Sequence, residues 1–269
     1  MRTRRFCRHD ELADTSRDVG HPLTAAVFDT IGVGYAPIRQ PDARLGSAID
    51  GALGDAETVI NVGAGAGSYE PRGKRVIAVD PSATMIRQRS VGSAPAVQGT
   101  AEALPLPDRC ADAAMALHTV VHWTDLRRGL AEMRRVARRV VLLTIDPDVA
   151  RGLWIVADYV PEMISGHLSR LPAISTLVDQ LPGARVVAVP VPSDCTDRFL
   201  VALWSRPEAY LDADVRRATS PWHQIPASAS ERAVERLRVE IEDGSWDRRY
   251  GHLRGLDSLD VGLRLVIAD

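Results

Sequence analysis

The 269-residue sequence has few lysine, asparagine, cysteine and aromatic residues. Its 33 basic residues comprise one lysine, Lys74, and 32 arginines, and Asn61 is the single asparagine. GC-rich coding favours arginine, alanine, glycine and proline codons over lysine and asparagine codons. We therefore interpret the arginine excess as genomic background and infer a high-GC bacterial source.

Cysteines and long apolar runs are also scarce. Cys7, Cys110 and Cys195 lie far apart without CxxC spacing, which indicates neither a disulfide framework nor a zinc site. No segment has the long apolar run of a membrane helix, and the first residues lack the apolar region of a secretory signal. The sequence predicts a cytoplasmic protein with free thiols and no membrane attachment.

The charged residues nearly balance, with 33 basic against 35 acidic and a formal net charge of -2. A nucleic-acid binder needs a local positive field, so the balance predicts no nucleic-acid partner. A content of 45% hydrophobic and 25% charged residues describes a globular chain with ample core-forming material. This composition excludes disordered, collagenous and disulfide-stapled chains.

Two kinds of apolar pattern alternate along residues 42–145. Short β-branched runs typical of buried strands are separated by stretches in which apolar residues recur at helical spacing. This alternation predicts right-handed crossovers and a parallel sheet covered on both faces. We expect helices at 42–53, 82–89 and 126–137, and strands at 58–62, 76–79, 96–97, 111–117 and 140–145.

After residue 146 the alternation pauses, and two Leu-Pro breaks indicate a helical insertion at 147–183. Two strand-like runs follow, at 184–189 and 198–204. The connection between them is far too short for a helical crossover, which predicts an antiparallel hairpin.

The ends of the chain are less regular. Residues 1–24 are polar and lack a clear period, so we expect a flexible N-terminal arm. An amphipathic stretch around 230–241 predicts that 207–269 form a helical C-terminal extension. No second core is evident, so 207–269 extend the single domain that we expect over 25–206.

A glycine-rich turn follows the first strand, with Gly63, Gly65 and Gly67 at alternate positions. Small residues let the backbone turn sharply and approach a ligand, and the N–H groups around the loop offer donors. Asp80 ends the next strand, 17 residues after Gly63, where a carboxylate can accept from both ribose hydroxyls. NAD-dependent dehydrogenases, flavoproteins and methyltransferases share such a turn, and Asp80 could alternatively cap the next helix.

Four segments together separate these alternatives: Asn61-Val-Gly-Ala-Gly-Ala-Gly67, Val79-Asp-Pro-Ser82, Ala101-Glu-Ala-Leu-Pro105 and Asp112-Ala-Ala-Met-Ala-Leu117. Over residues 25–146 the chain resembles class I S-adenosylmethionine (SAM)-dependent methyltransferases of the type 11 or UbiE-like family. The resemblance implies an α/β, Rossmann-like doubly wound fold with a mainly parallel seven-stranded sheet, a C-terminal antiparallel hairpin and a helical cap. It implies methyl transfer from SAM to an oxygen, nitrogen or carbon atom of a small-molecule acceptor, with 147–183 as the acceptor cap.

The resemblance also assigns cofactor-binding residues. The glycines lie against the methionine part of SAM, Asp80 holds the ribose, and the adenine side is formed by Pro81, Thr100, Ala101 and Glu102. This chain departs from the family by having Thr100 where aspartate is common. Only 13 residues separate Gly67 from Asp80, which predicts that the first crossover helix is reduced to about one turn.

An aromatic and glycine segment, Phe28-Asp-Thr-Ile-Gly-Val-Gly-Tyr35, resembles the part of this family that closes over SAM. There, Tyr35 could shield the sulfonium and Arg39 could pair with the methionine carboxylate. The alternatives are a turn anchor for Tyr35 and an ordinary surface arginine for Arg39.

His118 comes directly after the strand at 111–117, where parallel sheets place ligand-facing residues. A histidine of near-neutral pKa suits the removal of an acceptor proton, so His118 is the candidate base or acceptor contact. A hydrogen-bonded structural histidine is the alternative. His118 and His122 are four residues apart, but no third ligand is evident, and we predict no metal site.

Two other functions remain open at this point: a SAM-binding scaffold or regulator that has lost catalysis, and an NAD-dependent oxidoreductase. The sequence is compatible with a monomer or a homodimer.

Overall fold

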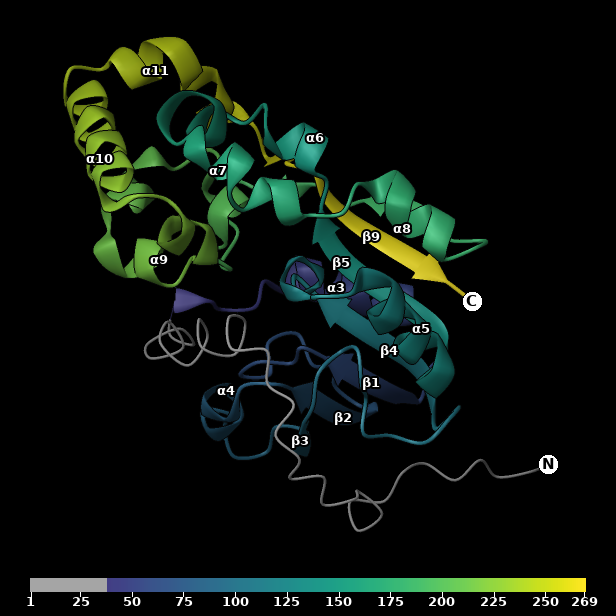
Figure 1. The fold of residues 1–269 in the computed structure, drawn as a ribbon. Helices are drawn as coiled ribbons and strands as arrows, with labels where there is room; N and C mark the ends of the chain where they lie inside the picture. The colour runs from purple at the N-terminus through teal and green to yellow at the C-terminus, as the bar shows by residue number, and fades with distance from the viewer. Residues whose placement is uncertain (1–37) are drawn as a thin grey trace.

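The computed structural model describes residues 38–269. The predicted arm at 1–24 and the candidate Tyr35 lie outside these residues. The centre of the fold is a seven-stranded sheet with the strand order β3-β2-β1-β4-β5-β9-β6 (Figure 1). Its strands are β1 (Thr58–Val62), β2 (Arg75–Asp80), β3 (Ala96–Gln98), β4 (Ala111–Leu117), β5 (Ala137–Ile145), β6 (Arg185–Ala188) and β9 (Leu263–Ala268).

The first five strands pair in parallel, which confirms the doubly wound, mainly parallel fold predicted from the sequence. Every residue of β1 is buried, as expected for a strand covered on both faces. Only turns fill the connection between Gly67 and β2, in agreement with the short spacing.

The faces of the sheet are covered by α3 (Ala43–Leu53) on one side and α5 (Leu126–Val136) on the other. Leu45 and Ile49 of α3 join a core that includes Val59, whereas Leu130 of α5 joins a second core with Ile60. Adjacent strand residues therefore enter opposite cores, which is the period-two alternation of a pleated sheet.

The helices of this half begin at polar residues that cap them. The Asp42 side chain accepts from the Arg44 N–H at the start of α3. Ser82 does the same for Met85 in α4 (Ala83–Arg87), and Asp125 for Arg128 in α5. Such side chains satisfy N–H groups that the first helical turn leaves unpaired.

The antiparallel pair of the sheet is β6 with β9, and β9 is also antiparallel to β5. The predicted hairpin between 184–189 and 198–204 is therefore wrong in its second strand. Residues 200–203 instead form a buried 3-10 helix, η5 (Leu200–Leu203). A short apolar run fits a buried helical turn as well as a strand, and the C-terminal β9 occupies the place beside β6.

The insertion at 147–183 is helical, as predicted, with α6 (Pro147–Ala150), a π-helical turn η3 (Ile155–Tyr159), α7 (Glu162–Ser165), η4 (Leu168–Arg170) and α8 (Ile174–Gln180). Residues 207–269 are only partly helical, because they end in β9. Figure 1 shows α7, α9, α10 and α11 gathered at one end of the molecule, away from β3. The remaining elements are η2 (Val120–His122), β7 (Val191–Pro192), η6 (Pro207–Leu211), α9 (Ala213–Arg217), η7 (Ser220–Gln224), α10 (Ala227–Glu242), α11 (Ser245–Tyr250), η8 (Gly251–Gly255) and β8 (Ser258–Leu259).

An aromatic cluster centred on Trp154 joins the insertion to the C-terminal helices. Its ring meets Tyr159, Tyr210 and Trp246 edge-on, at centroid distances of 5.4, 5.6 and 5.2 Å. Edge-to-face pairs of this kind add to the free energy gained by burial. In the part of the chain that the structure describes, no helix is long and apolar enough to cross a membrane.

Candidate functional site

The glycine loop begins where β1 ends. Gly63, Gly65 and Gly67 have φ angles of 71°, 52° and 95°, in the left-handed region that other residues rarely adopt. A Cβ at Gly63 would lie 2.2 Å from the Thr119 Oγ1 atom, in the loop after β4. The absence of a side chain at Gly63 therefore lets the ends of β1 and β4 meet.

Asp80 lies beside this loop and is 7% exposed. Its Oδ2 atom accepts from the Gly65 N–H at 2.7 Å, and its Oδ1 atom accepts from the Ser82 N–H at 2.8 Å. The carboxylate thus fixes the glycine loop to the start of α4. Each carboxylate oxygen has about two acceptor positions, so a carboxylate can take part in more than two hydrogen bonds.

The loop offers fewer backbone donors than the sequence suggested. The N–H groups of Gly63 and Ala64 both bond to the Val79 carbonyl, and the Gly67 N–H bonds to the Ala64 carbonyl. The Gly65 N–H is used by Asp80. The N–H groups at these four positions are therefore all used within the chain. A ligand could approach the loop backbone closely here, but it would gain no N–H donor from these residues.

Replacing Gly63 with alanine is expected to lower the free energy of unfolding by about 2–4 kcal/mol, because the left-handed φ and the overlap with Thr119 both add strain. Urea denaturation measures the effect. Gly73→Ala is the matched control, since Gly73 has a φ of 81° with nothing within 4 Å of an added Cβ. Equal losses in the two variants would show that the contact with Thr119 is unimportant.

A buried ion pair that the sequence analysis missed supports the loop from outside. Arg89 binds the Glu70 carboxylate, and the two side chains are 6% and 12% exposed. Arg89 also donates to the Gly65 carbonyl at 3.2 Å. Glu70 accepts from the Ala94 N–H at 3.2 Å. The pair links the segment after the loop to the chain entering β3.

The residues predicted for the adenine side lie at the ends of β2 and β3. The Pro81 carbonyl accepts from the Gln98 side chain at 2.9 Å. Thr100 forms an isolated bridge with Ala103, and Ala101 is buried.

Glu102 is directed toward a different part of the fold. Its Oε1 atom accepts from the Thr124 N–H at 2.7 Å and from the Asp125 N–H at 3.3 Å. Glu102 therefore anchors the segment that leads into α5, a structural role that the resemblance alone did not indicate.

His118 directly follows β4 and has a φ of 57°, which is unusual for a residue with a side chain. Its N–H bonds to the Leu143 carbonyl of β5 at 2.7 Å, which holds the turn in place. Its ring lies 5.0 Å from the ring of Phe199, and its Nε2 atom is buried without a partner within residues 38–269. The strained turn places an imidazole with one unsatisfied nitrogen at the carboxyl edge of the sheet.

Burial is the main cause that lowers the pKa of His118 to about 4, and the nearby Arg39 charge lowers it further, whereas Asp197 opposes the shift. This value is well below the near-neutral pKa expected from the sequence. His118 is accordingly a neutral hydrogen-bonding group at physiological pH.

Arg39 forms a bidentate pair with Asp197, with Nε–Oδ1 and Nη2–Oδ2 distances of 2.5 and 3.2 Å. Tyr69 donates to the same carboxylate at 3.0 Å. The Arg39 guanidinium also lies 5.8 Å from the centre of the Phe199 ring. The structure thus brings both Arg39 and His118 beside Phe199, and Asp197 is a partner that no local motif indicated.

His118 and Arg39 line one cavity of about 90 Å³ between the sheet edge and the insertion. The insertion contributes His167, Leu168 and Leu171 to its wall. The other residues that line it are Val121, His122, Thr144, Ile145, Phe199, Leu200, Val201, Thr219, Ser220 and Pro221. Gly63 packs against Thr119, the neighbour in sequence of His118, so the glycine loop lies beside the segment that supplies His118 to this cavity.

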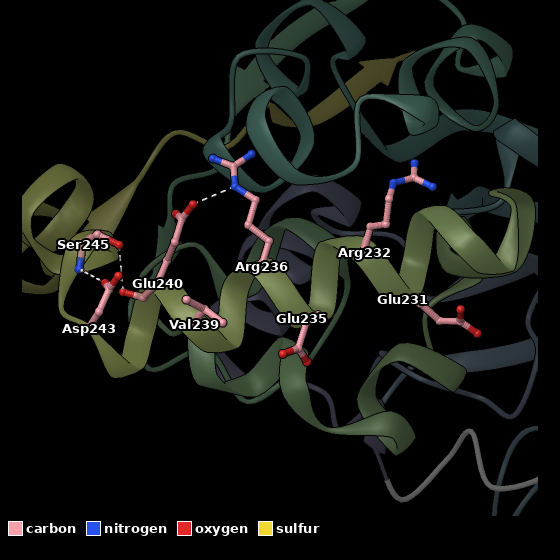
Figure 2. A pocket seen from close by; sticks show the side chains of 8 residues that line it. All are labelled: Glu231, Arg232, Glu235, Arg236, Val239, Glu240, Asp243 and Ser245. Atoms are coloured by element: carbon pink, nitrogen blue, oxygen red, sulfur yellow. Dashed lines mark hydrogen bonds and ion pairs between the residues drawn. The ribbon is translucent and has the colours of Figure 1, made fainter.

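A second hollow runs along α10, and Figure 2 shows its charged lining. Arg236 pairs with Glu240 at 2.6 Å, and Arg232 pairs with Glu162 at 2.9 Å. These exposed ion pairs are typical of a solvated helix face. Among the described residues, no group of three or more His, Cys, Asp or Glu side chains could hold a metal ion.

The residues at the sheet edge fit the predicted cofactor. A side chain at Gly63 would overlap Thr119, and a side chain at Gly65 would be strained by the left-handed backbone. Glycine at both positions therefore leaves room for a ligand against the backbone. The adjacent Asp80 carboxylate is buried and suited to accept from ribose hydroxyls. These features lie at the carboxyl ends of β1 and β2, where open α/β sheets bind ligands.

Comparison with known proteins agrees with the predicted family and fold. Residues 60–144 match the family model for a methyltransferase domain. A crystal structure from Anabaena variabilis, of a protein assigned as a methyltransferase of an antibiotic biosynthesis pathway, aligns with a TM-score of 0.82 and 30% identity. The alignment covers 87% of this chain and 100% of that protein. A SAM-dependent methyltransferase of Thermotoga maritima shares the fold with a TM-score of 0.51 at 21% identity, over 62% of this chain and 85% of that one.

Curated relatives match over shorter stretches. The uncharacterised methyltransferase YcgJ of Bacillus subtilis is 30% identical over 130 residues, which span 42% of this chain and 47% of that protein. An uncharacterised methyltransferase of Mycobacterium tuberculosis is 37% identical over 89 residues, or 31% of this chain and 36% of that protein. The chain thus spans less than half the length of these curated relatives. The match to the Anabaena variabilis structure, over 87% of this chain at 30% identity, nevertheless shows that the chain belongs to the class I SAM-dependent methyltransferase family.

Proposed function

We propose that the protein transfers a methyl group from SAM to a small-molecule acceptor bound in the cavity beside His118. The observation that carries this proposal is the contact between Gly63 and Thr119, because it sets the glycine loop beside the segment that supplies His118 to the cavity. In-line methyl transfer needs the acceptor and the methyl donor to be aligned, and adjoining sites supply that alignment.

When bound, SAM supplies an electrophilic methyl group carried on a sulfonium. In this chain the backbone at Gly63, Gly65 and Gly67 would lie against its methionine part, and Asp80 would hold its ribose. Pro81, Thr100 and Ala101 are proposed for the adenine side. Arg39 and Tyr35 remain proposals for the methionine end, and the charge of Arg39 is already balanced by its two contacts with Asp197.

The insertion at 147–183 is proposed as the acceptor cap. His167, Leu168 and Leu171 close the cavity opposite the sheet edge, and Leu168 and Leu171 are buried. Their apolar side chains exclude water from an acceptor, which strengthens every polar interaction inside the cavity.

His118 is proposed to receive the acceptor proton at Nε2. A free hydroxyl is a poor proton donor to a base whose pKa is about 4. A hydroxyl oxygen that has gained a methyl group is far more acidic, so the proton moves to Nε2 during or after methyl transfer. The low pKa thus suits a base that acts late and stays neutral until then.

Replacing His118 with asparagine is expected to lower turnover by about 10²–10⁴-fold, the usual contribution of a positioned base. Asparagine tolerates the left-handed φ at this position, so the variant keeps the turn. The assay follows the label from methyl-labelled SAM into a panel of small hydroxyl, amine and carbon acceptors. SAM affinity should stay within about threefold of the parent. Equal losses of affinity and turnover would make His118 a cofactor-binding residue.

A further inference from the structure

Three unsatisfied polar atoms lie in the wall of the cavity between the sheet edge and the insertion. They are His118 Nε2 after β4, Thr144 Oγ1 on β5 and His167 Nδ1 before η4. Each is buried without a hydrogen-bond partner within residues 38–269. An unsatisfied buried polar group costs about 1–3 kcal/mol, and native proteins retain few of them. Three such atoms from separate elements around one cavity indicate a polar ligand group that satisfies them.

Most of the remaining wall is apolar, with Arg39, His122, Thr219 and Ser220 as its other polar residues. Hydrocarbon side chains come from the segment after β4, from β5, from η4 and from η5, so a ligand body packed here has little contact with water. The volume of about 90 Å³ is three times the share of one water molecule in the liquid, about 30 Å³. The cavity therefore suits a compact group rather than a long chain.

The charge of the wall favours an uncharged ligand. No aspartate or glutamate is among the lining residues within the described range, so a cationic amine would have no counter-ion there. The one cationic side chain, Arg39, is already bound to Asp197 through two contacts. His118, His122 and His167 are held neutral by burial, which lowers the pKa of each. A carboxylate would therefore lose its hydration without gaining a free cation.

We propose that this cavity binds a compact, uncharged hydroxyl compound, whose hydroxyl group bonds to His118 and His167 while its hydrocarbon body packs against Phe199 and the surrounding aliphatic side chains. A hydroxyl both donates and accepts, so it matches a neutral imidazole in either tautomer and the Thr144 hydroxyl. This inference rests on the proposed function, since it names the acceptor class of the same site.

Binding of matched probes to the full chain, measured by calorimetry in the absence of SAM, tests the proposal. Phenol carries one hydroxyl on a compact ring, toluene replaces it with a methyl group, and benzoate and benzylammonium add a charge. We expect phenol to bind at least about tenfold more tightly than the other three, because only phenol satisfies the buried polar atoms without adding a charge. Equal binding of toluene, tighter binding of either ion, or no binding of phenol would overturn the proposal.

Paired variants separate hydrogen bonding from a merely structural role. Glutamine places a polar atom near the position of a histidine Nε2, and asparagine places one near Nδ1. We expect His118→Gln to keep phenol affinity within about threefold and His118→Asn to lose about five- to tenfold. At His167 the unsatisfied atom is Nδ1, so we expect the reverse. There, His167→Asn should keep phenol affinity within about threefold, and His167→Gln should lose about five- to tenfold.

His252→Asn, at an exposed position of η8, is the control and should leave phenol affinity unchanged. If glutamine and asparagine act alike at both His118 and His167, these atoms do not bind the hydroxyl and the proposal fails. Because the probes are measured without SAM, a failure here leaves methyl transfer untouched. A failure of SAM to bind would overturn the proposed function and leave the phenol result standing.

Discussion

Asp80→Ala is expected to lower the affinity for SAM by about tenfold to a hundredfold. A bidentate contact between a buried carboxylate and ribose hydroxyls is worth about 1–3 kcal/mol, and alanine removes both acceptors. The same change removes the acceptor for the Gly65 and Ser82 N–H groups, which donate to Asp80 at 2.7 and 2.8 Å. The variant therefore also loosens the glycine loop, and calorimetric titration with SAM measures the combined loss.

Asp112→Ala is the matched control for Asp80. Asp112 also accepts from backbone groups, the Glu57 N–H at 3.2 Å and the Thr58 N–H at 3.1 Å, but at the opposite edge of the sheet. We expect it to lower the free energy of unfolding while SAM affinity is kept. If Asp80→Ala binds SAM as tightly as the parent, or if both variants lose affinity equally, the ribose assignment is wrong.

Acidification from about pH 7.5 to about pH 5 is expected to lower the free energy of unfolding by several kcal/mol. Burial lowers the pKa of His118 to about 4, of His122 to about 3 and of His167 to about 4, from an ordinary value of 6.5. Nearby positive charges add to each shift, from Arg39 at His118, and from Arg170 at His122 and His167.

Acidification lowers the free energy of unfolding because the unfolded chain binds more protons than the folded chain. Between about pH 6.5 and pH 4 the unfolded chain binds protons at these histidines and the folded chain does not, so falling pH favours unfolding. The stabilisation is complete above pH 6.5 and is lost as the pH falls toward the folded pKa values. Each pKa unit corresponds to about 1.4 kcal/mol, which gives up to roughly 2 kcal/mol per histidine by pH 5.

Buried or paired carboxylates do not offset this loss. Arg44 holds the pKa of Asp42 well below its usual range, and hydrogen bonds from Thr58 lower that of Asp112 despite its partial burial. Both stay ionised in the folded chain throughout this window. Urea denaturation at the two pH values measures the effect, and His167→Asn should remove about a third of it. A free energy of unfolding that is equal at both pH values would show that these histidines are not buried in neutral form.

The local patterns of the sequence were sufficient for the parallel half of the fold. β1 and β4 have the predicted bounds because each is a predominantly apolar run that ends at a polar or glycine-rich segment. The run at 198–204 had the same appearance, but its residues are buried as a helical turn. The choice depends on β9, about 60 residues later, which pairs with both β5 and β6, and such long-range pairing has no local signal.

The residues of the candidate site also differ in whether the sequence could predict them. Gly63, Gly65 and Asp80 could be predicted because their spacing within one crossover carries the information. His167, Thr144 and Asp197 could not, since His167 and Thr144 reach the cavity from distant segments, Asp197 only pairs with the lining residue Arg39, and none belongs to a recognisable motif. The low pKa of His118 was also beyond the sequence, because it arises from burial in the folded chain and from the proximity of Arg39.

Titration of the full chain with SAM, S-adenosylhomocysteine and NAD by calorimetry tests the central claim most directly. The backbone at Gly63 and Gly65 and the Asp80 carboxylate are expected to bind both SAM and S-adenosylhomocysteine, one molecule per chain, with no measurable binding of NAD. Tight binding of NAD without a response to either of the other two compounds would contradict the account.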